Sequence, residues 1–256
     1  MIFDSHSHTE FSADSSMTAI EAMDAAEALG LGLVITEHLD IGFPGEKPFD
    51  FEPEEYFAKY AKLRGEKLAL GVEVGLTESN FEDNLAFIAR GSFDLVIGSL
   101  HVLNGRDLYY PETYAGLEKE AVYRRYLTNM AALVREHRYI DVLGHIDYIA
   151  RYAPYADGEL DYPTYAVEID DVFAAALETD TVPELNTRRL GSDRALDSLA
   201  MIYRRYRELG GKFVTLGSDA HQKKAVGANF DRAKKIAADA GLKIVTFVGR
   251  QMKECG

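Results

Sequence analysis

Short apolar runs alternate with longer amphipathic stretches along this 256-residue chain, and this alternation is what most restricts its fold. The runs are aliphatic or β-branched on both faces, which is typical of strands buried on both sides in a parallel sheet. The amphipathic stretches have the 3.6-residue period of helices that cover such a sheet. Strand and helix repeat seven or eight times, which favours an α/β fold of the TIM-barrel type over a doubly wound open sheet. The predicted strands are Ile2-Phe3, Leu33–Ile35, Leu68–Val74, Leu95–Leu100, Val142-Leu143, Val182–Leu185, Phe213–Leu216 and Ile244–Val248.

The predicted helices have recognisable boundaries. Thr18 with Glu21 three residues later is a capping-box pattern, and Gly30 is a typical helix stop. A helix that Thr18 caps and that extends to Leu29 is therefore expected. No linker or repeat divides the chain, so we expect residues 1–256 to form a single domain. Two stretches without a pattern, 40–53 and 103–116, follow predicted strands and would form loops at the rim of a barrel. The other helices are expected at 54–64, 81–89, 117–137, 162–177, 192–209 and 231–240.

Six of the seven histidines stand at or just beyond the end of a predicted strand. In a β/α barrel the carboxyl ends of the strands converge on one rim, so these side chains would meet although they are far apart in sequence. The strand period of two also puts Asp4, His6 and His8 on one face. Imidazole and carboxylate groups are ligands of zinc, manganese and iron, so the pattern predicts a metal site. The seventh histidine, His137, ends a predicted helix and is expected to interact with the helix C-terminus instead. The site residues are His6, His8, His38, His101, His145, His221, Glu73 and Asp219.

The chain is acidic, with 42 Asp and Glu residues against 28 Lys and Arg and a formal net charge of −14. Such a surface is unsuited to nucleic acid, because nucleic-acid binding needs basic side chains that displace counterions from phosphates. No apolar run approaches the ~20 residues needed to cross a bilayer, and the N-terminus lacks the pattern of a secretory signal. We therefore expect a cytoplasmic protein that binds neither nucleic acid nor membranes. The one cysteine, Cys255, excludes an internal disulfide, and no pattern specifies an oligomeric state.

Motifs at the predicted strand ends, taken in order, resemble the polymerase-and-histidinol-phosphatase (PHP) family of metal-dependent phosphoesterases. The resemblance spans nearly the whole chain, and within the family the chain is most similar to the stand-alone histidinol-phosphate phosphatases. The segments that carry it are Asp4-Ser-His6-Ser-His8 with Asp14, Thr36-Glu37-His38, Gly71-Val-Glu73, Gly98-Ser-Leu-His101, Gly144-His145-Ile-Asp147, Glu184-Leu-Asn-Thr187 and Gly217-Ser-Asp219-Ala-His221.

The resemblance implies a distorted seven-stranded (β/α) barrel, in which the run Ile244–Val248 would be peripheral. It also implies a site for three divalent ions that share one bridging carboxylate. Nitrogen and oxygen ligands without thiolate suit Zn, Mn or Fe, and the sequence does not choose among them. The implied ligand sets are His6, His8, Glu73 and Asp219 for one ion, Glu73 with His101 and His145 for the second, and Asp14, His38 and His221 for the third.

The implied activity is hydrolysis of L-histidinol phosphate in histidine biosynthesis, by a hydroxide that two ions hold and that attacks phosphorus in line with the leaving alcohol. Glu73 and Asp219 would be catalytic, and the proton for the leaving group would come from Asp219 or from a metal-bound water. Arg151, together with Arg188 or Arg189, would hold the phosphate oxygens. Rim residues suited to the ammonium and imidazole groups of the substrate are Asp40, Phe43, Asp107, Tyr109, Tyr110 and Glu112.

Three other functions are compatible with parts of this pattern. A PHP phosphoesterase acting on nucleotides or another small phosphate ester would have the same metal ligands and differ only at the rim. An amidohydrolase-like enzyme that cleaves C–N bonds often uses a carboxylated lysine, and no lysine stands at a predicted strand end. A metal-binding module without activity would tend to close its coordination shell, whereas nine ligands shared among three ions leave room for water and substrate.

Overall fold

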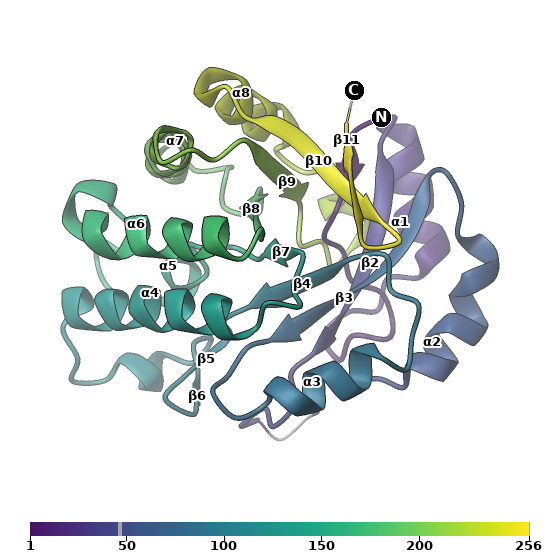
Figure 1. Ribbon diagram of the computed structural model, residues 1–256, viewed down its shortest axis with the longest axis horizontal. Helices are drawn as coiled ribbons and strands as arrows, with labels where there is room; N and C mark the ends of the chain where they lie inside the picture. The colour runs from purple at the N-terminus through teal and green to yellow at the C-terminus, as the bar shows by residue number, and fades with distance from the viewer. Residues whose placement is uncertain (46–47, 256) are drawn as a thin grey trace.

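The computed structural model describes residues 1–45 and 48–255, and it shows a sheet that curls round on itself with helices on its outer side (Figure 1). Neighbouring strands are parallel, except for the last pair, which is antiparallel. The predicted α/β barrel class is therefore confirmed. The strand order within the described residues is β1 (Phe3–Asp4), β2 (Gly32–Leu39), β3 (Leu68–Gly75), β4 (Val96–Ser99), β7 (Val142–Leu143), β8 (Val182–Asn186), β9 (Phe213–Gly217), β10 (Lys243–Val248) and β11 (Gln251–Glu254).

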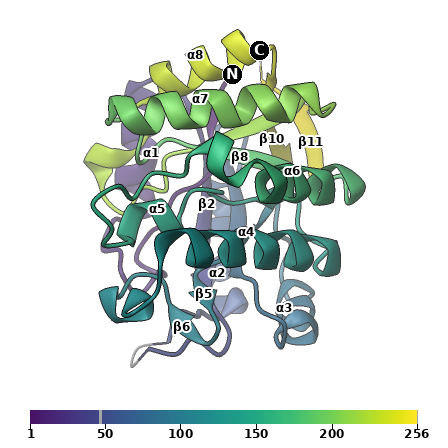
Figure 2. The same ribbon diagram turned by 90° about the vertical axis from the view of Figure 1, so that its left-hand side faces the viewer.

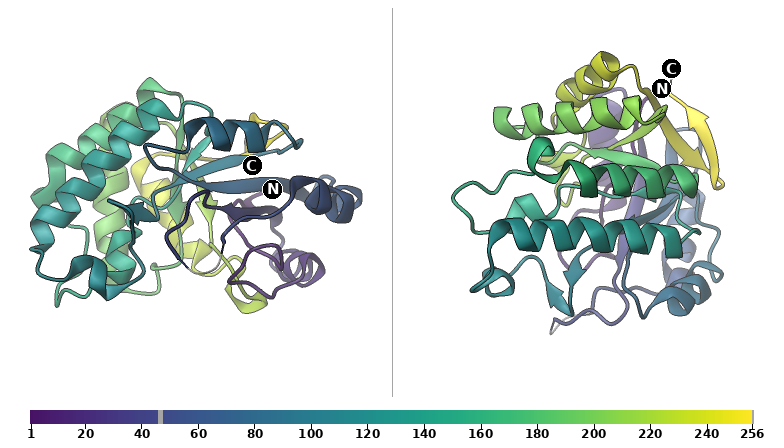
Figure 3. Two further views of the ribbon diagram at one scale, coloured as in Figure 1. Left: turned by 90° about the horizontal axis from the view of Figure 1, so that it is seen from below. Right: turned by 60° about the vertical axis from the view of Figure 1, so that its left-hand side comes forward.

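Helices surround this sheet on its convex side. They are α1 (Ala19–Ala28), α2 (Pro53–Tyr60), α3 (Phe81–Ile88), α4 (Lys119–Glu136), α5 (Ile149–Tyr152), α6 (Tyr162–Glu178), α7 (Asp193–Glu208) and α8 (Phe230–Ala240). Figure 2 shows α4, α6, α7 and α8 stacked side by side, and the left view of Figure 3 shows the purple and blue helices α1, α2 and α3 further round the outside of the curled sheet. The predicted capping box is confirmed: Thr18 Oγ1 accepts from Glu21 N at 3.2 Å, and the Glu21 carboxylate accepts from Thr18 N at 2.9 Å. None of the helices in the described part of the chain combines the length and apolar character that a membrane span needs.

The stretch 103–116, expected as a loop, has short elements of its own. A small antiparallel hairpin is formed by β5 (Val102–Leu103) and β6 (Arg106–Asp107), and a 3₁₀ turn follows at Pro111–Tyr114. Further 3₁₀ turns lie at Ala61–Leu63, where the helix predicted to reach residue 64 tightens, and at Lys223–Ala225.

The ring closes where β1 meets β9. Ser5 N donates to Leu216 O at 2.8 Å, and Asp219 N donates to His6 O at 2.9 Å. β10 pairs only with the first two residues of β9, so the rest of β9 is free to bond the chain that follows β1. Seven strands, β1 to β4 and β7 to β9, therefore form the distorted barrel, as the family resemblance implies.

The last strands continue beyond this ring, and the expectation that the run Ile244–Val248 is peripheral holds for strand order but not for side chains. Val245 and Phe247 are buried in one apolar cluster with residues from six strands of the ring or their edges. The turn after β10 is also tied to the barrel, because Gly249 N donates to the Asp94 carboxylate at 2.8 Å. Side chains of β10 thus help to fill one end of the barrel interior, whereas those of β11 are exposed. The other members of the cluster are Phe3, Val34, Ala69, Leu95, Ile97, Val142 and Val182.

Side chains on the inner face change from apolar to polar along β3 and β4. On β3, Ala69 belongs to the interior apolar cluster, and Glu73 stands on the same face four residues later. On β4, Ile97 belongs to that cluster and His101 follows at the same spacing. Because alternate residues of a strand share a face, the carboxyl ends of the strands present their polar residues above an apolar floor.

Candidate metal centre

The buried carboxylate of Glu73, on β3, lies at the centre of a cluster of five histidines. These histidines follow β1, β4 and β7 or lie near the end of β2, so together with β3 five neighbouring strands contribute to the cluster. The two oxygens of Glu73 face different histidines, which places the carboxylate to bridge two cations. Oε2 is 2.9 Å from His38 Nδ1, 3.2 Å from His6 Nε2 and 3.4 Å from His8 Nε2, and Oε1 is 3.1 Å from His145 Nε2 and 3.3 Å from His101 Nε2.

Asp219 and Asp14 extend the cluster on the side of β9. Asp219 Oδ1 is 3.4 Å from His8 Nε2. Asp14 Oδ2 is 3.0 Å from His221 Nε2, and His221 Nε2 is 3.3 Å from His38 Nε2. The structure therefore brings together all nine side chains named above as metal ligands.

Carboxylates behind the cluster hold two of the histidine rings through Nδ1. Glu184 Oε1 is 2.7 Å from His6 Nδ1, and Asp40 Oδ1 is 2.8 Å from His101 Nδ1. A ring that donates its Nδ1–H to a carboxylate keeps its lone pair on Nε2. In both histidines Nε2 is the atom directed at Glu73.

His8 is held less directly, through a hydroxyl group. Its Nδ1 is 3.1 Å from Ser12 Oγ, which donates to Glu37 Oε2 at 2.6 Å. Glu37 is buried and also accepts from Thr9 N at 3.0 Å. The loop after β1 is therefore fixed to β2 by one carboxylate, and the orientation of the His8 ring follows from that loop.

The roles of these outer carboxylates were only partly visible in the sequence. Asp40, which the sequence placed at the rim, is buried, and its carboxylate bonds His101. In the sequence, Glu184 is distinguished only as part of a motif that resembles the PHP family, and its contact with His6 is not predicted. The signal that could have found it is its position on the inner face of β8, two residues after the buried Val182.

Burial and charge act against each other in this cluster. Burial alone would raise the pKa of Glu73, but the charges of His6 and His101 hold it well below its usual range. Burial alone would lower the pKa of His101, but the carboxylates of Asp40 and Glu73 raise it well above its usual value. Burial and nearby histidines lower the pKa of His8. Ionised Glu73 and neutral His8 are the forms in which these side chains bind metals.

The central atoms fit bound cations. Nε2 of His6, Nε2 of His8, Nδ1 of His38 and Oε2 of Glu73 are buried, and although the nitrogens lie 2.9–3.4 Å from that oxygen, none of these atoms makes a hydrogen bond of regular geometry among the described residues. A buried polar atom without a partner costs about 1–3 kcal/mol, so several at one point call for a compensating group. All four atoms can carry a lone pair, and the set holds nitrogen and oxygen without thiolate. Divalent Zn, Mn or Fe would satisfy them together.

Two candidate arginines reach this cluster. Arg151, in α5, has Nη1 2.8 Å from Asp219 Oδ2, and its guanidinium lies 4.8 Å from the centre of the Tyr152 ring. Arg188, just after β8, donates from Nη1 to Asp219 O at 2.7 Å. Because Arg188 Nη1 also lies 3.4 Å from Asp219 Oδ2, two guanidinium groups flank the same carboxylate, in a protein that is otherwise strongly acidic.

Arg189 is engaged elsewhere. Its guanidinium is held by Asp147 and by Glu159, with a nitrogen–oxygen distance of 2.6 Å to each. Both carboxylates are buried, so this ion pair joins the segment after β7 to the loop before α6. Of the two neighbouring arginines, Arg188 is thus the one placed beside the cluster.

His137 lies outside the cluster, at the C-cap of α4, where its backbone N–H donates to Leu133 O at 2.8 Å while its side chain bonds other groups. Its Nε2 donates to Thr77 O at 3.1 Å, and its Nδ1 accepts from Tyr139 Oη at 2.7 Å. The ring is buried, and these bonds join α4 to the loop after β3.

Aromatic side chains lie near the arginines at the predicted rim. Tyr109 and Tyr110 are exposed by 55% and 51%. The Tyr109 ring lies 5.0 Å from the ring of Tyr152, which in turn stacks under Arg151. On the side of β2, Phe43 packs against the neighbouring ring of Phe49 at 4.7 Å.

Comparisons with known proteins agree with this geometry. A family model described as the PHP domain matches residues 4–188. A probable histidinol-phosphatase of Clostridium acetobutylicum is 47% identical over 253 residues, covering 99% of each chain. The histidinol-phosphatase of Lactococcus lactis is 31% identical over 97% of this chain and 95% of its own. A crystal structure of the Lactococcus lactis enzyme in complex with Zn, L-histidinol and phosphate matches with a TM-score of 0.94 and 30% identity, covering 98% of each chain. With its motifs, its barrel and its buried histidine–carboxylate cluster, this chain belongs to the PHP domain family.

Proposed function

We propose that this chain hydrolyses the phosphate monoester of L-histidinol phosphate to give L-histidinol and inorganic phosphate. The observation that carries the proposal is the full-length match to a histidinol phosphate phosphatase whose structure holds Zn, L-histidinol and phosphate. The chemistry of the site agrees, because a buried cluster of metal-type ligands lies beside two arginines. A second relative, at 47% identity, bears the same activity in its name.

The proposed cofactors are three divalent ions, with Zn as the first candidate because the relative's structure contains it. When bound, such ions supply Lewis-acid activation of water and of the phosphoryl group. Glu73 is the proposed bridging ligand, since its two oxygens face separate histidines. The proposed ligand sets are His6, His8, Glu73 and Asp219; Glu73, His101 and His145; and Asp14, His38 and His221.

The charges in the site support a count of three ions. Six carboxylates contact the histidine rings, five directly and one through Ser12. Their six negative charges equal the positive charge on three divalent ions. Arg151 and Arg188 then remain to offset the two negative charges of a phosphate monoester. The six are Asp14, Glu37, Asp40, Glu73, Glu184 and Asp219.

Arg151 and Arg188 are the proposed phosphate-binding groups. Each uses one part of its guanidinium on Asp219, and a guanidinium has five N–H donors, so donors remain for substrate oxygens. Stacking on Tyr152 fixes the plane of Arg151. Charge-assisted hydrogen bonds of this kind hold a phosphate in place and stabilise the charge that develops on its non-bridging oxygens.

Asp219 connects the arginines to the histidines. Burial would raise its pKa, but the contact with His8 and the charges of His6, His221 and Arg151 hold that pKa well below its usual range. An ionised Asp219 suits the binding of a cation and of Arg151. Its service as the proton donor to the leaving alkoxide stays a prediction.

The test is phosphate release by the purified, metal-loaded protein from L-histidinol phosphate, beside nucleotides and sugar phosphates at equal concentration. We expect a kcat/KM of ~10⁴ M⁻¹s⁻¹ or more for L-histidinol phosphate and far lower values for the rest. Glu73→Gln, prepared in the same way, controls for contaminating phosphatases. Equal or faster hydrolysis of a nucleotide would reject the substrate assignment while leaving the metal site in place.

A further inference from the structure

We propose that Asp40 is a positioning residue that orients His101 toward a bound cation, and that Gly75 is required because it leaves the space that the Asp40 carboxylate occupies. The inference rests on the proposed metal site and goes one layer beyond its ligands. It assigns a role to two residues that do not touch a cation themselves.

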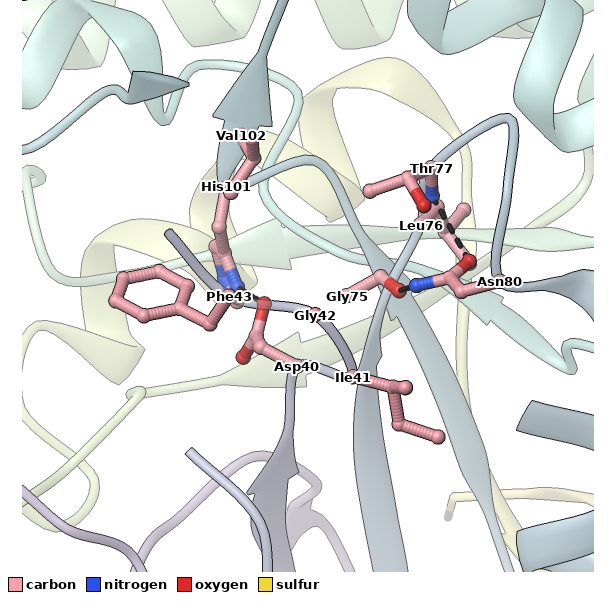
Figure 4. Close-up of a pocket in the computed structure, with 10 residues that line it drawn as sticks. All are labelled: Asp40, Ile41, Gly42, Phe43, Gly75, Leu76, Thr77, Asn80, His101 and Val102. Carbon is pink, nitrogen blue, oxygen red and sulfur yellow. Dashed lines mark hydrogen bonds and ion pairs between the residues drawn. The ribbon is translucent and has the colours of Figure 1, made fainter. Parts of the chain in front are cut away.

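Asp40 is held in a fixed position from which only its carboxylate reaches the site. It follows the last residue of β2, and its N–H donates to Phe49 O at 2.6 Å. Figure 4 shows the carboxylate directed at the ring of His101, with Oδ1 at 2.8 Å from Nδ1. Both side chains are buried, so water does not compete for this bond.

Gly75 stands directly beside that carboxylate. β2 and β3 pair in parallel with Leu39 opposite Val74, so the next residues along, Asp40 and Gly75, are neighbours across the strands. A Cβ on Gly75 would lie 2.7 Å from Cγ of Asp40 and would overlap its Oδ1. The φ angle of Gly75 is not positive, so space rather than backbone conformation excludes a side chain here.

The position of the Asp40 carboxylate determines which nitrogen of His101 carries the proton as well as how the ring is oriented. A neutral imidazole carries one N–H, and the partner of that N–H decides which nitrogen keeps the lone pair. Because Asp40 accepts from Nδ1, the lone pair stays on Nε2, which lies 3.3 Å from Glu73 Oε1. Outer partners of this kind typically change metal affinity or activity by about 10- to 100-fold.

The same construction recurs on the other side of the barrel. Glu184 Oε1 is 2.7 Å from His6 Nδ1, and its Oε2 accepts from His145 N at 2.9 Å. A Cβ on Gly217, at the end of β9, would overlap Oε1 of Glu184 and would also lie 2.5 Å from Cβ of His6. Two separate glycines thus make room for two separate carboxylates, each behind one histidine of the cluster. The repetition supports a functional role for the absence of a side chain at Gly75 and at Gly217.

The experiment compares the zinc affinity of the full chain with that of Asp40→Asn, Gly75→Ala and Gly65→Ala, by competition with a chromophoric chelator. Asp40→Asn keeps the shape of the side chain and removes its charge. Gly65→Ala is the matched control, since a Cβ there meets nothing within 4 Å. We expect the first two variants to weaken binding of at least one zinc ion by about 10- to 100-fold and the control to match the wild type.

A second readout follows the His101 ring itself. Long-range ¹H–¹⁵N spectra of the zinc-loaded protein should show Nδ1–H at His101 in the wild type, and Asp40→Ala and Gly75→Ala should disturb that signal. In an Asp40→Ala background, adding Gly75→Ala should cost little further affinity, because the oxygen it would displace is gone.

Wild-type zinc affinity in Asp40→Asn would overturn the role of Asp40, and so would an unchanged His101 signal in Asp40→Ala. Fully additive losses in the double variant would overturn the role of Gly75. Zinc binding is measured without substrate, so a failure of the L-histidinol phosphate assignment would leave these results unaffected.

Discussion

The adjacent residues Arg188 and Arg189 should respond in opposite ways to the same substitution by alanine. The Arg188 side chain is 36% exposed beside Asp219, with 3.4 Å between Nη1 and Oδ2, so it is open to a substrate phosphate. The Arg189 side chain is 16% exposed and is held at 2.6 Å by Asp147 and Glu159. Arg188→Ala removes the proposed substrate contact, whereas Arg189→Ala leaves two buried carboxylates without their partner.

The magnitudes follow from these contacts. A hydrogen bond to a charged group contributes about 1.5–3 kcal/mol, and each 1.4 kcal/mol is about tenfold, so Arg188→Ala should lower kcat/KM by about 10- to 100-fold. Removing one partner of a buried ion pair costs about 3–5 kcal/mol, and each kcal/mol lowers Tm by about 2–4 °C in a chain of this size. Arg189→Ala should therefore lower Tm by about 10 °C while kcat/KM at low temperature stays close to the wild-type value.

The assay measures phosphate release from L-histidinol phosphate and thermal unfolding by circular dichroism, both on zinc-loaded protein. Arg188→Lys is the matched control, because it keeps the charge but loses the planar fork, and its kcat/KM should lie between those of wild type and Arg188→Ala. A loss of activity in Arg189→Ala at unchanged Tm, with full activity in Arg188→Ala, would refute the reasoning. Equal losses of activity in both variants at unchanged Tm would refute it as well.

Three further predictions follow from the cluster and its surroundings. Removing metal with a chelator should lower Tm as well as abolish phosphate release, because the buried histidine nitrogens and the Glu73 carboxylate lose the cations that they would bind. An unchanged Tm in calorimetry would contradict this prediction. Gly144→Ala should cost about 1–3 kcal/mol of unfolding free energy, because its Cβ would collide with Ser99 Oγ, which donates to Glu73 at 2.7 Å. Adding Ser99→Ala should restore part of that stability in urea unfolding, and no recovery would contradict the collision. Burial lowers the pKa of His137 in the folded protein, so as pH falls through 6.5 the unfolded chain takes up the proton first and the free energy of unfolding decreases. His137→Gln should make the free energy of unfolding, measured with urea, depend less steeply on pH in this range. An unchanged pH dependence would contradict the prediction.

Much of the fold and of the candidate site could be predicted from the sequence because both follow from short-range periods. Apolar runs buried on both faces and amphipathic segments between them predict a barrel of parallel strands. The carboxyl ends of such strands meet at one rim, so His38, Glu73 and His101 could be placed together before any distance was known. Each of the eight predicted strands is present in the structure, with boundaries that differ by a few residues.

The tertiary structure alone decided which carboxylate holds which histidine of the cluster. Glu184 holds His6 across 178 residues of sequence, and Asp40 holds His101 across 61. Such contacts depend on the register of neighbouring strands and on the gap left by Gly75, and no local pattern carries that information. For the same reason the sequence could not choose between Arg188 and Arg189, which differ only in the carboxylates that the fold brings to them. The identity of the metal-type ligands was thus a property of strand ends, whereas their orientation is a property of packing between strands.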